Sequence, residues 1–335
     1  MSFPVATFGH LRDLTDAGGL YEHADRTAAR PEHGYCVDDV ARGLVVVSRS
    51  DHEQDDLRRH YLSFVLAAQS ADGRFHNRRH VDLTWSDRPS VEDCWGRALW
   101  GLGTTAAALG CDELRDDALE AFARGATWRS PHARAMAFAG LGAAEVLRVR
   151  PDNEPARALL AAAARHIGAP ADDPAWPWPE PRLTYANAAL PEVMLAAGSA
   201  LQRPLLVADG LRLLGWLLAV QTCNGHLSVV PVGGLGPAER VGRFDQQPIE
   251  VAALADACAR AFALTNDVRW RDGVQMAARW FLGDNDAATS LLDIVSGGGC
   301  DGLMPRGRND NQGAESTLAL LSTLQHARAL ALTGP

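Results

Sequence analysis

Hydrophobic residues recur three and four positions apart over most of this chain, the spacing that places them on one face of an α-helix. No stretch shows the convincing alternation of apolar and polar residues that is typical of a β-strand. A weakly amphipathic segment lies within residues 1–20. Eleven further segments are expected to be helical: 37–50, 53–70, 91–109, 112–127, 131–150, 153–168, 184–201, 203–222, 247–265, 267–283 and 312–332. The pattern therefore predicts an all-α protein of twelve helices.

The connections between these segments differ in length in a regular way. Tight links follow the first, third, fifth, seventh and ninth of the eleven segments, at 51–52, 110–111, 151–152, 202 and 266. Most of the intervening connections are long and rich in Gly, Pro, His, Trp and Tyr: 21–36, 71–90, 169–183, 223–246 and 284–311. Short links produce antiparallel helix hairpins. Six stacked hairpins predict one (α/α)6 toroid domain over 1–335, with the long loops around one mouth.

Composition narrows the class of protein. The 335 residues, 47% of them hydrophobic, suffice for a large core. The formal net charge of −9 and the lack of a basic run argue against a nucleic-acid surface. The first ten residues lack the features of a signal peptide, and no apolar run approaches the ~20 residues that span a bilayer. We expect a cytoplasmic protein with no membrane segment, and its six cysteines, which lack CxxC spacing, should be reduced.

Polar and aromatic residues gather where the predicted inner helices begin, whereas the outer helices begin plainly. The candidate catalytic residues are Asp38, Asp39, Glu92, Glu250 and Glu315. The candidate substrate-binding residues are His33, Tyr35, Arg42, Trp85, Asp93, Arg97, Trp178, Tyr185, Asn187, Gln247, Asp301 and Asn311. Aromatic faces stack on sugar rings, amides and arginines bind hydroxyl groups, and paired carboxylates handle a glycosidic bond. This set therefore favours a carbohydrate site.

Each carboxylate also has a purely structural explanation. Residues 90–93 fit a capping box, residues 247–250 place Pro at N1 and Glu at N3, and Asp39 with Arg42 forms an (i, i+3) pair. Capping does not explain the aromatic and amide residues at the same helix ends. Neighbours on a helix point about 100° apart, so one of the two aspartates is expected to face the ring centre while the other caps the helix or orients Arg42. A glutamate from another helix would complete the pair.

Two other chemistries stay open. Histidines at the mouth side, namely His33, His76, His80, His132 and His226, would suit proton transfer in a sugar epimerase, with His33, His76 or His226 as the base. Cys36, Cys94, Cys223 and Cys300 could join His33 in a zinc site, although their spacing gives no local support. We expect neither a metal nor a cofactor.

Four motifs together resemble a bacterial group related to the six-hairpin glycosidases: HGYCVDDVAR at 33–42, SVEDCWGRALW at 90–100, YANAALP at 185–191 and NQGAEST at 311–317. Members of that group are encoded beside, or fused to, glycosyltransferases and mannan-processing enzymes. The aspartate pair is also similar to that of endo-α-1,6-mannanases, in which two adjacent aspartates on an inner helix are catalytic, and Asp38 and Asp39 are the matching positions.

The resemblance implies a glycoside hydrolase that acts on a manno- or gluco-configured oligosaccharide, with a glycosyltransferase as an implied partner. A sugar epimerase or isomerase of the related barrel is one alternative. A non-catalytic glycan-binding module that serves a glycosyltransferase is the other. The last predicts that replacing both aspartates by asparagine leaves glycan binding intact.

Overall fold

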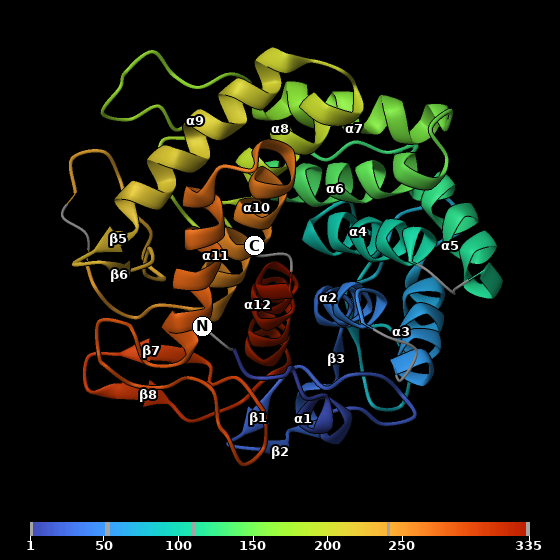
Figure 1. Cartoon of the computed structure of the whole chain (residues 1–335). Coiled ribbons are helices and arrows are strands. Elements are labelled where there is room, and N and C mark those ends of the chain that lie inside the picture. Colours follow the sequence, from blue (N-terminus) through green and yellow to red (C-terminus); the bar gives the residue numbers. More distant parts are fainter. Residues whose placement is uncertain (1–2, 51–53, 109–111, 240–241, 333–335) are drawn as a thin grey trace.

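A computed structural model describes residues 3–50, 54–108, 112–239 and 242–332. Six helices form an inner ring in which each contacts the next and the last contacts the first (Figure 1). They are α2 (Val37–Ser48), α4 (Asp93–Ala107), α6 (Ala133–Val149), α8 (Ala189–Ala200), α10 (Pro248–Thr265) and α12 (Ala314–Leu332). The predicted (α/α)6 toroid is confirmed.

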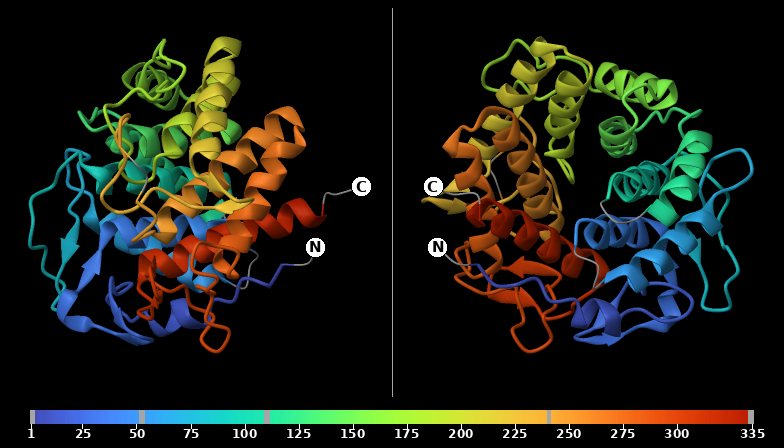
Figure 2. Two further views of the ribbon diagram at one scale, coloured as in Figure 1. Left: turned by 90° about the vertical axis from the view of Figure 1, so that its left-hand side faces the viewer. Right: turned by 45° about the vertical axis from the view of Figure 1, so that its right-hand side comes forward.

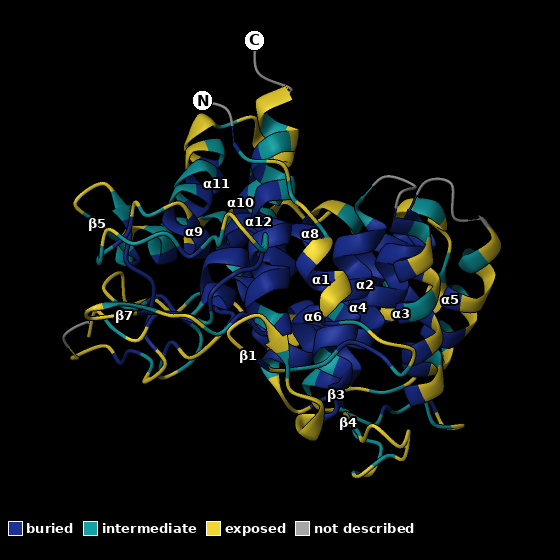
Figure 3. Cartoon of the chain, turned by 90° about the horizontal axis from the view of Figure 1, so that it is seen from below, coloured by how far each residue is buried: buried dark blue, intermediate teal, exposed yellow. Residues whose placement is uncertain are grey.

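Outer helices pack around this ring, each against the inner helices beside it (Figure 2). They are α1 (Gly9–Asp13), α3 (Asp55–Ala68), α5 (Asp112–Gly125), α7 (Glu154–Ile167), α9 (Pro204–Val220) and α11 (Val268–Phe281). The tight links expected at 51–52 and 110–111 lie outside the described residues. Buried residues concentrate on the inner helices and on the facing sides of the outer ones (Figure 3). The core therefore lies between the two rings.

Small residues let neighbouring inner helices approach closely. A Cβ atom added to Gly103 of α4 would collide with the backbone carbonyl of Gly142 on α6, and one added to Gly96 would collide with that of Ala135. Side chains of any size at these two glycines would push the helices apart and open the ring. Glycine in a helix interior costs roughly 0.5–1 kcal/mol relative to alanine, so the close packing must offset that cost.

Two expectations need correction. The N-terminal helix is only the five residues of α1, and strands are present. Within the described residues they form antiparallel pairs of two or three residues: β1 (Ala24–Asp25) with β2 (Ala28–Ala29), β3 (Tyr35–Cys36) with β4 (Arg78–Arg79), β5 (Thr222–Cys223) with β6 (His226–Leu227), and β7 (Gly302–Met304) with β8 (Gly307–Asn309). A 3₁₀ turn also covers Pro31–His33. Elements this short leave no periodic pattern in a sequence.

These strands and isolated bridges tie the long loops to one another at the end where the inner helices begin. Tyr21 bridges to Tyr35, Phe75 to Ser90, Leu183 to Leu235, and Gln246 to both Pro231 and Leu303. The bridges satisfy backbone groups that would otherwise be left without partners at the rim. The mouth is thus framed by a belt of paired loops. No helix in the described part of the chain is long and apolar enough to span a bilayer.

Candidate active site

A cavity of about 450 Å³ opens at the mouth of the toroid. Six of the predicted site residues line it, from the N-terminal ends of three inner helices and from the loop before α12: Asp38, Asp39, Arg42, Gln247, Asp301 and Glu315. The remaining lining residues are Glu22, His23, Cys36, Arg78, Asn309, Gly313 and Ser316. Alternate helices thus deliver acids that are distant in the sequence to one shared space.

The adjacent aspartates turn toward opposite neighbours of α2. Asp38 accepts a hydrogen bond from Asn77 Nδ2 at 3.1 Å, and its Oδ1 lies 3.3 Å from Nε of Arg97 on α4. Asp39 is buried and pairs with Arg42 one turn later. The expectation that one aspartate orients Arg42 is met by Asp39, while both carboxylates line the cavity.

Arg42 links Asp39 to a carboxylate on α12, the inner helix that closes the ring beside α2. Its Nη2 lies 2.7 Å from Oε2 of Glu315 on α12, and its other terminal nitrogen binds Asp39. Burial raises the pKa of Asp39 to about 7, even though Arg42 opposes this shift. The negative charges of Glu315 and Glu22 act in the same direction as burial. Asp39 therefore holds its proton at a pH where an ordinary aspartate has lost it.

A second chain of contacts runs from Asp38 around the rim. Arg97 is buried, stacks on Phe138 with its guanidinium carbon 4.2 Å from the ring centroid, and also lies 3.7 Å from Asp93 Oδ2. Asp93 in turn accepts a hydrogen bond of 2.7 Å from the hydroxyl group of Tyr185. Tyr185 is 41% exposed, with the Arg134 guanidinium carbon 5.6 Å from its ring centroid. It lines a neighbouring space with His132 and Glu180 and is connected to Asp38 through Asp93 and Arg97.

Two predicted catalytic glutamates lie away from the cavity. Glu92 is exposed at the N-cap of α4 and does not line the mouth. Glu250 is buried and accepts hydrogen bonds from the backbone of Ala186 and, at 2.8 Å, from Asn187 Nδ2. Burial raises the pKa of Glu250 to about 7. Ala186 has a φ of 45°, in the left-handed region, so Glu250 and Asn187 fix a strained turn before α8.

The aromatic predictions need more correction. Tyr35 is 1% exposed, donates to Asp16 and stacks on Tyr21. Trp178 is 2% exposed and stacks on Trp216. Neither ring is available to a sugar, because both complete the core beneath the loops. Trp85 is partly exposed and stacks on His76 with ring centroids 5.0 Å apart.

Two further predicted residues have defined positions outside the cavity lining. His33 packs edge-on against His23 with ring centroids 4.8 Å apart. Asn311 uses its side-chain oxygen to accept a hydrogen bond of 3.0 Å from the backbone of Arg26. Asn311 thereby fastens the loop before α12 to the loop that carries Glu22 and His23.

Helix capping does not account for the acids at the mouth. The N-caps of α2, α4 and α10 are Cys36, Glu92 and Gln247, and none of them makes a side-chain capping bond. The capping box expected at 90–93 is absent, since Ser90 Oγ accepts from the backbone of Glu92 instead. Two of the structural explanations are confirmed: the Asp39–Arg42 pair, and the start of α10 with Pro248 at N1 and Glu250 at N3.

Potential metal ligands gather at one point of the mouth. Within the described residues, Glu22, Cys36 and Asp39 form the group whose ligand atoms lie within 4.8 Å of one another, and it includes none of Cys94, Cys223, Cys300 and His33. The Glu22 and Asp39 carboxylates already pair with arginines. Burial raises the pKa of the Cys36 thiol well above its ordinary value, which disfavours the thiolate that binds metals. This arrangement does not bring together the cysteine zinc site considered from the sequence.

The sequence analysis missed Glu22, His23 and Arg78. Glu22 pairs with Arg78 and lies 3.7 Å from His23. All three lie on long connections and not at helix starts, where the predicted site residues are concentrated. The composition of the loops is the available signal, since the connections 21–36 and 71–90 are expected at the mouth.

Comparisons with known proteins bear on the fold. No protein-family model matches the sequence, and the curated proteins offer no sequence match. A sugar epimerase from a ruminal bacterium superposes with a TM-score of 0.75 at 12% identity, over 97% of this chain and 95% of that one. A GH76 α-mannanase from Bacteroides thetaiotaomicron gives 0.65 at 12% identity, over 96% and 94%.

A third solved structure is an α-1,6-mannanase of Salegentibacter, with a TM-score of 0.63 at 10% identity over 95% of this chain and 94% of that one. It is described as an inactive variant in which two adjacent aspartates are replaced by alanine, bound to α-1,6-mannotetrose. At these identities the similarities establish a shared (α/α)6 toroid.

Proposed function

We propose that this protein is a glycoside hydrolase that cleaves an oligosaccharide at the mouth of the toroid, with Asp38 and Asp39 as the reactive carboxylates. The observation that carries the proposal is an adjacent pair that opens on one cavity in two different environments. Asp39 is buried with a raised pKa, whereas Asp38 is paired with Arg97. Glycosidases use two carboxyl groups in different environments, so that one acts as the acid and the other as the base or nucleophile.

In this mechanism Asp39 is the proton donor. Its pKa of about 7 lets it carry a proton near neutral pH and give it to the glycosidic oxygen as the bond breaks. Asp38 is the carboxylate that activates water or attacks the sugar. Glu315 and Arg42 hold Asp39 in place. Because acids outnumber arginines in the cavity lining, the mouth would stabilise the positive charge of an oxocarbenium-like transition state.

The mannanase similarity suggests which substrates to test first. The Salegentibacter enzyme variant was bound to α-1,6-mannotetrose, and its loss of activity accompanies the loss of two adjacent aspartates. We therefore place α-1,6-linked manno-oligosaccharides ahead of β-linked and gluco-configured ones. Tyr185 is the exposed ring near the pair that is able to stack on a sugar.

A substrate panel tests the proposal. The purified chain is incubated with α- and β-linked manno- and gluco-oligosaccharides, and the products are separated by chromatography. Shorter oligosaccharides should appear with the parent protein and with Glu92→Gln, but not with Asp38→Asn or Asp39→Asn. Equal turnover by the parent and both aspartate variants would show that the reactive groups lie elsewhere.

A sugar epimerase or isomerase is the second candidate. The sugar epimerase superposes with a higher TM-score than either mannanase, and His23 with His33 provides imidazoles at the edge of the mouth. Epimerisation at C2 exchanges that carbon-bound hydrogen with solvent while the chain length stays fixed. Incubation of mannose and of reducing disaccharides in D₂O, followed by mass spectrometry, separates the two reactions.

The non-catalytic glycan-binding module remains a third interpretation. It expects glycan binding by the Asp38→Asn and Asp39→Asn variants and turnover by none of the proteins, parent included. The glycosyltransferase partner and the cytoplasmic location also stay predictions. A pull-down from cells that produce the tagged chain, followed by cell fractionation, tests both.

A further inference from the structure

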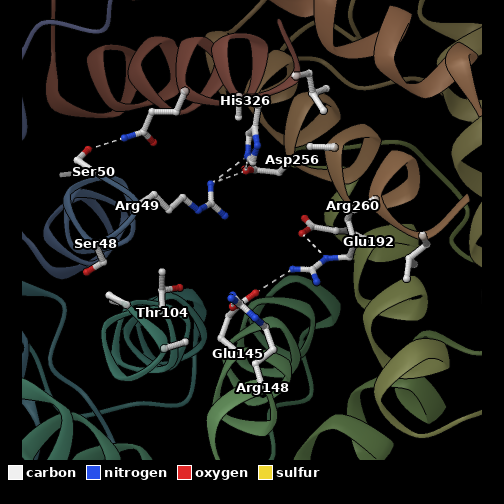
Figure 4. Close-up of a pocket in the computed structure, with 18 residues that line it drawn as sticks. Ser48, Arg49, Ser50, Thr104, Glu145, Arg148, Glu192, Asp256, Arg260 and His326 are labelled. Carbon is white, nitrogen blue, oxygen red and sulfur yellow. Dashed lines mark hydrogen bonds and ion pairs between the residues drawn. The ribbon is translucent and has the colours of Figure 1, made fainter. Parts of the chain in front are cut away.

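A second cavity lies at the other end of the toroid axis. It has a volume of about 800 Å³ and is lined mostly by the C-terminal halves of inner helices, with Glu192 contributed by the first turn of α8. We call it the basal pocket. Its ionisable residues are Arg49, Arg148, Arg260, Glu145, Glu192, Asp256 and His326, which surround one space from different helices (Figure 4). The volume falls within the range of small-molecule sites.

Two ion networks face each other across this pocket. On one side Asp256 binds Arg49 Nη1 at 2.6 Å and His326 Nε2 at 2.6 Å (Figure 4). On the opposite side Glu145 binds both Arg148 and Arg260, at 2.5 and 3.2 Å. Removing charges from water costs several kcal/mol per ion, and an apolar filling is often equally stable. Stability alone therefore does not explain two networks around an open space.

Glu192 joins the second network through one of its two carboxylate oxygens, Oε1. It receives a hydrogen bond of 3.0 Å from Arg260 Nε. Burial raises the pKa of Glu192, against the attraction of Arg260. A glutamate with a raised pKa is less fully ionised near neutral pH. The positive charge of the arginines in the pocket is therefore less fully balanced.

Hydrogen-bond donors exceed acceptors in the basal pocket. Arg49 makes all its hydrogen bonds through Nη1, so that Nε and Nη2 have no partner among the residues described. Arg148 likewise uses only Nη1, and Arg260 leaves Nη1 unused, as far as the described chain shows. The carboxylates facing them accept through Asp256 Oδ1, Glu192 Oε1 and both oxygens of Glu145. A ligand that fits must bring acceptors, and preferably negative charge.

The side chains that line the pocket between the charged groups are short. Ala107, Ala108, Ala259, Ala263 and Ala329 line the pocket beside them. Methyl groups leave the volume open, where longer side chains would have filled it. Arginines near helix C-termini also complement the helix dipoles, but that role requires neither an 800 Å³ space nor unused donors inside it.

We propose that the basal pocket binds a small ligand through its oxyanion group, a phosphate or a carboxylate held between Arg49, Arg148 and Arg260. Guanidinium groups match both oxyanions with paired N–H donors, which an ammonium group does not offer. The proposal does not depend on the reaction at the mouth. The pocket shares no lining residue with the mouth cavity.

Isothermal titration calorimetry of the whole protein tests it, with inorganic phosphate, citrate, mannose 6-phosphate and mannose as probes. We expect saturable binding of at least one anion, weakened by added salt and by Arg148→Gln, whereas any binding of mannose at the mouth should be unaffected by Arg148→Gln. Phosphate-type and carboxylate-type anions are separate arms, and saturation in either supports the site while identifying its source. Arg148→Gln should weaken binding about tenfold, as the loss of a charged hydrogen bond does.

Matched variants make the test specific. The Arg148 side chain is 66% exposed, so Arg148→Gln should fold, which circular dichroism checks. Arg49→Lys keeps the positive charge but loses the planar fork and should also weaken binding. Arg182→Gln, which removes an exposed ion pair elsewhere, should not. Absence of binding by every anion, or anion binding lost on Arg78→Gln at the mouth but kept by Arg148→Gln and Arg49→Lys, would each overturn the proposal.

Discussion

The two ends of the toroid axis differ in the balance between acidic and basic side chains around their cavities. The mouth cavity, at the N-termini of inner helices, is lined by five carboxylates and two arginines. The basal pocket, at the C-terminal ends, has three carboxylates and three arginines with donors to spare. Acids are favoured near helix N-termini and arginines near C-termini by the helix dipole. In a ring of parallel inner helices, the helix dipoles therefore favour acids at one end of the axis and arginines at the other, whatever reaction the site performs.

A narrow space lies on the toroid axis between the mouth cavity and the basal pocket. It has a volume of about 50 Å³ and is lined by side chains such as Val45, Trp100 and Phe138. Arg42 and Glu315 border both this space and the mouth, while Glu192 and Asp256 border both this space and the basal pocket. No residue among those described lines both the mouth cavity and the basal pocket. Variants at each end should consequently affect different properties of the protein.

The largest expected effect is on catalysis at the mouth. Asp39→Asn removes the proposed proton donor and Asp38→Asn its partner, and either should lower kcat by about 10²–10⁴-fold, the range of general acid–base catalysis. Initial rates on the substrate found in the panel measure this. Thermal unfolding shows whether the folds survive. A loss below threefold in both variants would move the reaction away from the pair.

In the basal pocket, we expect a substitution to change the stability of the protein and not its catalytic rate. Asp256→Ala leaves Arg49 and His326 without their shared partner, and breaking a buried pair in this way costs about 3–5 kcal/mol. Burial opposes ionisation of Asp256, but Arg49 and His326 hold its pKa below the usual range. The stabilisation is thus present above the ordinary aspartate pKa of about 3.9 and is lost as the pH falls through the lower folded-state pKa.

Urea unfolding at pH 7 measures this prediction. Glu239→Gln, which removes an exposed ion pair with Arg182, is the matched control and should leave the midpoint unchanged. The catalytic rate of Asp256→Ala below its unfolding transition should match the parent. A midpoint identical to that of the parent would mean that the Asp256 network contributes no net stability.

The catalytic activity at the mouth should depend on pH through the ionisation of Asp39. Asp39 must be protonated to act, so activity should be present below its pKa of about 7 and fall as the pH rises through it. Glu315→Gln removes a negative charge that raises this pKa. The alkaline limb of kcat/KM should move to lower pH in this variant and stay fixed in Glu92→Gln. A limb that does not move with Glu315→Gln would argue against Asp39 as the titrating acid.

Helix periodicity and loop length were enough to predict the toroid and the end at which the acids meet. They did not predict where α8 begins. Residues 184–187 continue the apolar pattern, yet Arg134 Nη2 and Glu250 bind Asn187 and hold this segment in a turn. α8 therefore starts at Ala189. Such long-range contacts leave no local trace in a sequence.

Residue type alone also did not predict which aromatic residues are exposed at the mouth and which are buried in the core. Tyr35 and Trp178 occur in loops rich in polar residues, as exposed sugar platforms do, but the loops fold over them. Glu22 and Arg78 show the reverse error, because they reach the cavity from loops that meet only through pairing of distant segments. The direction in which a loop side chain points depends on tertiary packing, which periodicity does not report.

The smallest expected effect tests whether the rim takes part in binding. Tyr185→Phe removes the hydrogen bond to Asp93 but keeps the ring, whereas Tyr185→Ala removes both. Stacking of an aromatic face contributes about 0.5–1.5 kcal/mol, so KM should rise roughly threefold to tenfold in Tyr185→Ala and change little in Tyr185→Phe. The value of kcat should stay near that of the parent in both, because Tyr185 reaches Asp38 only through Asp93 and Arg97. A fall in kcat with unchanged KM would instead assign the hydroxyl group to the positioning of Asp38.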